Sequence, residues 1–179
     1  MIARRVKQAL AQPAIWYRRL GDRAASVLEF AVIGPMFLLT IIGIIELGYF
    51  VFIQSILDWG TRDAARMIRT GQVQNAANAL TAFTNELCGD ISPMIPCGSV
   101  IIQSQVFGSW SSAQTTTNQP PQRAKNGNLV SAGFSAGTGQ QIMVVQVAYQ
   151  YFWMTGWLGM PSAFIMSTVA FRNEPFPSE

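Results

Sequence analysis

The hydrophobic positions form one long continuous run near the start of the chain and shorter periodic patterns after it. No residue from Phe30 to Ile45 carries a charge, and after Glu46 the apolar run resumes as far as Ile53. A helix needs about 20 residues to cross roughly 30 Å of hydrocarbon. The run at 30–53 is therefore long enough, and it predicts a transmembrane helix.

A cleaved secretory signal is the alternative interpretation, because a basic tail precedes this apolar run. The hydrophobic core of a signal peptide is only about 7–15 residues long. No small-residue cleavage pattern followed by polar sequence closes the run at 30–53. We therefore expect the helix to be retained as an anchor.

The helical pattern continues beyond the apolar run. Apolar residues recur at three- and four-residue spacing from Ile53 to Ile68, with aspartates and arginines between them. This spacing is typical of an amphipathic helix. It predicts one helix from about residue 25 to residue 69, ended by Gly71, and a second, shorter amphipathic helix over 73–88.

Three later segments, at 99–107, 141–151 and 163–171, are rich in β-branched and aromatic residues. They predict a small antiparallel sheet whose apolar face packs on the water-exposed half of the long helix. The predicted fold class is α+β, with a long N-terminal transmembrane helix extending into a small extracytoplasmic domain that holds the second helix and the sheet. The polar residues 108–140 predict a flexible insertion, either a tolerated surface excursion or a ligand-binding loop.

One apolar loop is predicted between the second and third strands, and it contains Trp153 and Trp157. Tryptophan favours interfaces because its ring is largely apolar and carries one polar N–H group. The loop is therefore expected either to meet the outer leaflet or a partner, or to complete the small core.

Charge is concentrated at the N-terminus. Residues 1–28 hold six basic residues and one acidic residue, giving +5, whereas the remaining 151 residues carry −2. Basic flanks stay in the cytoplasm, so we expect a basic cytoplasmic leader at 1–24, a transmembrane helix at 25–54 and an extracytoplasmic domain at 55–179. The basic pI belongs to the tail, and no nucleic-acid partner is expected.

The sequence offers little for catalysis. It contains no histidine, which removes the commonest general base and metal ligand. We expect no enzymatic activity, no catalytic residues, no metal or other cofactor and no small-molecule substrate. The two cysteines, Cys88 and Cys97, are separated by a segment rich in turn-forming residues, which predicts a disulfide outside the cytoplasm. Two free thiols are the alternative.

Several short motifs occur together and in order. They are small residues followed by Glu29-Phe30, an Ile-Ile-Glu-Leu-Gly segment around Glu46, an Ala-Ala-Arg helix extension and a terminal Phe-Arg-Asn-Glu-Pro. This set resembles the TadE-like proteins of tight-adherence (Tad, or Flp) pilus systems, which are minor pseudopilins. The resemblance covers residues 24–70 well and the strands at 141–151 and 163–175 more loosely.

The resemblance implies a site for a prepilin peptidase, which cuts such proteins on the cytoplasmic side. The bond in question is Ala24–Ala25, with alanine where the family usually has glycine. The methyl group of Ala24 lies beside the scissile bond. Two outcomes therefore remain: the peptidase cuts this chain slowly, or the chain works uncut as an anchor. Glu29 is then the helix carboxylate that pairs either with the new amino group of Ala25 or with Arg23; ordinary placement at the headgroups is the alternative.

Glu46 lies within the predicted span, sixteen positions after Phe30. At 1.5 Å per residue this is about 24 Å along the helix axis. We expect Glu46 to lie toward the outer interface, within reach of headgroups or water. A helix–helix contact is the alternative, because Gly43 and Gly48 permit close approach.

Together these features predict a non-catalytic, single-pass protein of the inner (cytoplasmic) membrane, with its N-terminus in the cytoplasm and its C-terminal domain in the periplasm or outside the cell. Its expected role is that of a TadE-like pseudopilin, or another membrane-anchored component in assembly of a Tad adhesion pilus. The expected partners are the lipid bilayer, pilin, other pilus assembly proteins and, if the leader is cut, the prepilin peptidase. The alternatives are a membrane-tethered binding module unrelated to pili and, less favoured, a membrane-anchored hydrolase.

Overall fold

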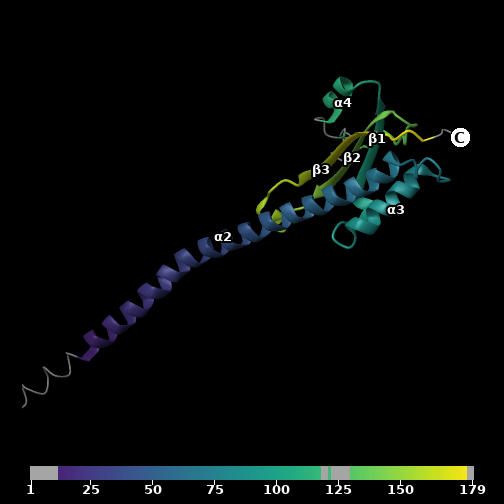
Figure 1. The fold of residues 1–179 in the computed structure, drawn as a ribbon. Helices are drawn as coiled ribbons and strands as arrows, with labels where there is room; N and C mark the ends of the chain where they lie inside the picture. The colour runs from purple at the N-terminus through teal and green to yellow at the C-terminus, as the bar shows by residue number, and fades with distance from the viewer. Residues whose placement is uncertain (1–11, 118–120, 122–129, 177–179) are drawn as a thin grey trace, which may run out of the picture. The chain divides into compact units, whose positions relative to one another are not determined.

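The computed structural model describes residues 12–117, 121 and 130–176, with helices and strands shown in Figure 1. The chain divides into two compact units, 1–47 and 48–179. The first unit consists of helix in its described part, with a polar start and an apolar continuation. The second holds the remaining elements and is the folded domain.

Helix α2 (Gln12–Arg69) is 58 residues long and begins earlier than predicted. Pro13 lies in its first turn, where the N–H that proline lacks would have no partner within the helix. The helix also continues through Pro35. Its C-terminal end agrees with the prediction, because Gly71 adopts a positive φ of 83°. The N–H of Gln72 bonds to the carbonyl of Met67 at 3.0 Å, which closes the helix in a Schellman motif.

The second predicted helix is present as α3 (Ala79–Ile91), but its predicted start at residue 73 is wrong. The side chain of Asn78 accepts a hydrogen bond from the backbone N–H of Thr81 at 3.0 Å. This N-cap satisfies a backbone donor that has no partner within the helix, so α3 begins after Asn78. Near the other end of the helix, Cys88 forms a disulfide with Cys97, as the sequence predicts.

The three predicted strands form one antiparallel sheet in the order β1-β2-β3. The strands are β1 (Val100–Phe107), β2 (Ile142–Tyr151) and β3 (Ala163–Arg172), each within one residue of its predicted bounds. Ile142 pairs with Phe107 on one side and with Arg172 on the other. The predicted α+β class, with its long apolar helix, second helix and three-stranded antiparallel sheet, is confirmed.

The core lies between one face of the sheet and the two helices α2 and α3 (Figure 1). Alternate residues of β2 face this core, as the period of two predicts. The most deeply buried residues include Ile53, Leu57, Ile68, Phe83, Leu87, Ile91, Met143, Val145, Val147 and Ile165. The C-terminal part of α2 is therefore an integral element of the domain.

The described part of the predicted insertion contains structure that the sequence did not indicate. A short helix, α4 (Trp110–Thr117), contacts all three strands. Ser104 of β1 also bonds through its backbone to Gly133 and Ser135, and its hydroxyl donates to Ser135 at 2.7 Å. Polar residues are held here by hydrogen bonds to the sheet edge. Residues 118–120 and 122–129 of the insertion lie outside the described residues, and its flexibility stays a prediction.

Candidate membrane anchor and interaction surfaces

The first candidate site is the start of the apolar run on α2. Residues 24–30 are exposed, and Phe30 is 76% exposed. A Cβ atom added at Gly34 would lie 3.5 Å from the ring of Phe30, so the ring covers this glycine one turn further on. Ala24, Ala25 and Glu29 are therefore accessible on the helix surface. Their roles in processing and pairing stay predictions, because the side chain of Arg23 is not described.

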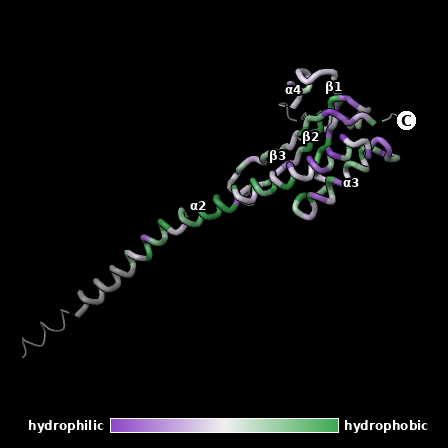
Figure 2. The backbone as a smooth tube through the Cα atoms, viewed as in Figure 1, coloured by the Kyte–Doolittle hydropathy of each residue, from purple (hydrophilic) through white to green (hydrophobic). Residues whose placement is uncertain are grey.

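The middle of the helix presents apolar side chains on every side. Within the described residues, α2 contains an 18-residue window with a mean hydropathy of 2.3 (Figure 2). Only 11% of this window is buried. Large exposed residues on this stretch include Val27, Leu28, Val32, Ile33, Met36, Phe37, Leu38, Ile44, Ile45, Leu47 and Val51. A helix that is apolar all round belongs in a protein core or a membrane. The length, composition and exposure of this one fit a single-pass membrane anchor.

Glu46 differs from its neighbours on this helix. It is only 3% exposed, and its side chain is engaged in a polar or electrostatic interaction. By contrast, Cβ atoms added at Gly43 or Gly48 would meet nothing within 4 Å, so the surface at these two glycines is open. Whether Glu46 reaches headgroups in a membrane stays a prediction.

The same helix carries the likeness to known proteins. Residues 24–66 match the family model of TadE-like proteins. The predicted resemblance is therefore confirmed over this segment, which we call the TadE-like segment. It lies entirely on α2 and ends before the sheet. The match supports a protein associated with a Tad pilus. No curated protein and no solved structure gives a significant match to the chain.

Beyond the apolar part, the TadE-like segment is bonded to the sheet through a carboxylate. Asp58 of α2 accepts a hydrogen bond of 2.6 Å from the hydroxyl of Ser167 on β3, and it forms an ion pair with Arg62 at 2.9 Å. The hydrogen bond from Ser167 lowers the pKa of Asp58 below its ordinary value, and Arg62 adds to this effect. Because Ser167 is 3% exposed, its hydroxyl is a buried donor that the carboxylate satisfies.

A second group of carboxylates lies where α2 meets α3. Burial raises the pKa of Asp90, and the neighbouring negative charges of Asp63 and Glu86 raise it further. Within the described residues, no group of three or more acidic or cysteine side chains is placed to hold a metal ion. The negative charges of these carboxylates therefore repel one another where the two helices cross.

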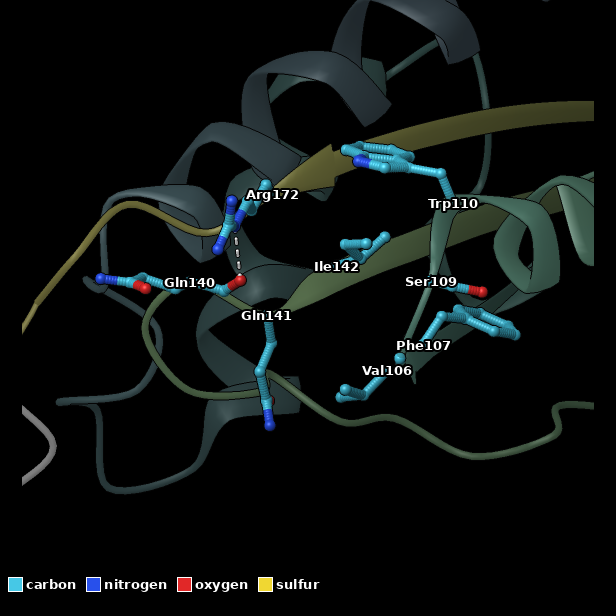
Figure 3. A pocket seen from close by; sticks show the side chains of 9 residues that line it. Val106, Phe107, Ser109, Trp110, Gln140, Gln141, Ile142 and Arg172 are labelled. Atoms are coloured by element: carbon cyan, nitrogen blue, oxygen red, sulfur yellow. Dashed lines mark hydrogen bonds between the residues drawn. The ribbon is translucent and has the colours of Figure 1, made fainter.

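An open pocket of about 570 Å³ lies at one end of the sheet (Figure 3). Trp110 of α4 and Ile142 of β2 line it, and among its described lining residues Arg172 of β3 is the charged one. The Nε–H of Arg172 donates to the backbone carbonyl of Gln140 at 2.7 Å. Among the described residues that line this pocket there is no carboxylate, thiol or lysine amine.

The structure also brings together aromatic residues that the sequence analysis treated separately. Phe50 of α2 stacks on Trp153 with ring centroids 5.4 Å apart, and Tyr151 meets both rings edge-on at 5.3 Å. Trp153 is half-buried against the core, whereas Trp157 is 77% exposed. Each expectation for the apolar loop therefore fits one tryptophan: Trp153 helps to complete the core, and Trp157 remains available to an external surface. The sequence did not indicate the contact between Phe50 and Trp153, because Phe50 precedes Trp153 by about one hundred residues.

Proposed function

We propose that this protein is a pseudopilin-type, non-catalytic component of a Tad (Flp) pilus assembly system in the cytoplasmic membrane. The observation that carries the proposal is the match of residues 24–66 to TadE-like proteins. The matched segment contains the apolar helix and its start, including Glu29 and Phe30. The proposed orientation is N-terminus inside and folded domain outside, in line with the basic flank.

The proposed action is lateral association of α2 with helices of pilin or of the assembly machinery. Lipid tails are as apolar as leucine, so helices associate in membranes through close packing and polar contacts. The open positions at Gly43 and Gly48, about 140° apart around the helix, support this proposal, because a neighbouring backbone can approach either of them without meeting a side chain.

Glu29 supplies the polar contact in this proposal. An unpaired carboxylate at the hydrocarbon edge costs free energy, and pairing recovers it only when the cation is held in place. The proposed cation is the amino group of Ala25 after cleavage at Ala24–Ala25, on the same or a neighbouring chain, or Arg23 when the leader remains. Exposure of Glu29 on the helix surface is consistent with a partner on another chain.

The test compares glutamate-to-glutamine variants by co-purification and cross-linking with the pilus proteins at equal expression. Glu29→Gln keeps size and hydrogen bonding but removes the charge, so membrane insertion should survive while recovery of pilus proteins falls. Glu86→Gln makes the same change in the folded domain and should recover them at the wild-type level. Glu46→Gln should lose much less than Glu29→Gln. Wild-type recovery with Glu29→Gln would refute the role of this carboxylate.

Processing is tested separately, by the mass of the mature chain in cells that contain a prepilin peptidase. Ala24→Gly restores the usual residue before the scissile bond and should increase the cleaved fraction. Ala31→Gly, inside the helix, is the matched control and should leave it unchanged. Equal cleavage of wild type and Ala24→Gly would show that the methyl group at residue 24 does not slow the peptidase.

A further inference from the structure

We propose that the β2–β3 loop, residues 152–162, is a second membrane-binding element, which inserts apolar side chains into the lipid leaflet adjacent to the folded domain. The proposal concerns how the domain is held against the bilayer. It requires the apolar helix to be an anchor, but it does not rest on the pilus function.

The composition of the loop suits hydrocarbon better than water. No charged residue occurs between Tyr151 and Phe171. Four large apolar residues of the loop are exposed: Phe152 at 67%, Met154 at 59%, Trp157 at 77% and Met160 at 43%. A cluster of this kind on a folded domain marks an interaction surface, because removing large apolar side chains from water is favourable.

The position of the loop identifies lipid as the occupant. A span of about 20 residues that starts at Phe30 ends at Tyr49, so the far edge of the hydrocarbon lies close to this residue. Phe50, the next residue, stacks on Trp153 at 5.4 Å, and Tyr49 lies 6.2 Å from Tyr151 between ring centroids. The base of the loop is therefore fixed to the helix at the level where lipid begins.

The aromatic residues at this level are also the types that membranes favour. Tryptophan and tyrosine concentrate at both membrane–water interfaces, because each has an apolar ring and a polar group. Tyr49 is 39% exposed and Trp157 is the most exposed tryptophan of the described residues. Together with Trp153 they form an aromatic belt contributed by both the helix and the loop. Binding of a soluble partner would not require the exposed apolar residues to lie at the level of the membrane surface, whereas binding of lipid does.

The rest of the domain provides an internal control. Trp110 is 53% exposed, but it follows β1, whose last residue, Phe107, pairs with the first residue of β2. The loop follows the last residue of β2, ten residues away, which is about 33 Å along an extended strand. Trp59 is 59% exposed and lies nine residues beyond Phe50 on α2, about 13 Å along its axis. Three exposed tryptophans therefore lie at three expected distances from the bilayer.

The experiment uses full-length protein reconstituted into phosphatidylcholine vesicles whose acyl chains carry bromine, which quenches tryptophan fluorescence on contact. Three variants each keep one tryptophan, Trp157, Trp59 or Trp110, with the other four tryptophans changed to phenylalanine. Phenylalanine at residue 153 preserves an aromatic ring against Phe50. Intact mass under non-reducing conditions reports the disulfide as a check on folding, and vesicle flotation reports the anchor independently.

The proposal predicts that brominated vesicles reduce the Trp157 signal at least twofold relative to unbrominated vesicles, while the Trp110 and Trp59 signals change little. Quenching of Trp157 no stronger than that of Trp110, in protein that floats with the vesicles, would overturn the proposal and indicate that the loop faces water or a protein. Failure of the protein to float would overturn both the anchor and the proposal. If the protein does not co-purify with pilus proteins while its Trp157 is still quenched by the vesicles, only the proposed function is contradicted.

Discussion

The crossing of α2 and α3 at Gly60 allows a sharp test of the domain packing. A Cβ atom added at Gly60 would lie 2.8 Å from Cγ2 of Ile91 and 3.2 Å from Cβ of Asp90. Carbon atoms in contact are normally about 3.5–4.0 Å apart, so the neighbour would have to move. Ile91 is fully buried and β-branched in a helix, which leaves it little rotamer freedom.

Two effects of Gly60→Ala oppose each other. Alanine is favoured over glycine in a helix by up to about 1 kcal/mol. Overpacking a filled core costs about 1–3 kcal/mol, so the net result should be a loss of up to about 2 kcal/mol. Gly89→Ala in α3 is the matched control, since an added Cβ there meets nothing within 4 Å. That variant should keep the helix gain and become more stable by up to about 1 kcal/mol.

The assay is thermal unfolding of the full chain in detergent, followed by circular dichroism. For a chain of this size, 1 kcal/mol corresponds to a shift in Tm of about 2–4 °C. The Tm of Gly60→Ala should therefore fall below that of wild type, and the Tm of Gly89→Ala should rise slightly above it. A Gly60→Ala protein as stable as Gly89→Ala would refute the close approach of the two helices.

Three further results are expected. Replacing Cys88 and Cys97 by serine should lower the free energy of unfolding by about 2–3 kcal/mol, measured by denaturant titration, because the unfolded chain loses a short closed loop; an unchanged midpoint would contradict this. Ser167→Ala should raise the pKa of Asp58 in an NMR titration and cost about 1 kcal/mol, since the carboxylate is 41% exposed and partly screened. The lowered pKa contributes stability above about pH 4 that is lost as pH falls through the folded pKa, so the cost should vanish in acid; a constant difference would argue against the contact. A reporter active only outside the cytoplasm, fused after Glu179, should be active, and activity of a cytoplasmic reporter there would reverse the orientation.

The sequence by itself determined the elements whose signals are local. Apolar length predicted the anchor, three- and four-residue spacing predicted its extension, and Gly71 ended it where a left-handed residue was needed. Strand bounds followed from β-branched and aromatic runs to within one residue. The resemblance at residues 24–66 was also visible, because its motifs are contiguous within one helix.

The start of α3 and the structure within residues 108–140 were missed for different reasons. Asn78 is a local capping signal that the sequence analysis overlooked. Helix α4 and the backbone bonds around Ser104 depend instead on a sheet edge that exists only after folding, and composition alone gave no sign of them. A polar composition predicts a segment without fixed structure, because it does not show that a folded surface will supply hydrogen-bond partners.

Some features behind the proposals follow from the sequence, and others follow only from the tertiary structure. The exposed anchor and Glu29 follow from the order of residues along one helix. The seating of Trp153 on Phe50, the bond from Ser167 to Asp58 and the close approach at Gly60 were decided only by tertiary structure. These contacts join residues about 30 to 110 positions apart, and hydrophobic periodicity specifies which face of an element is buried without specifying which partner covers it.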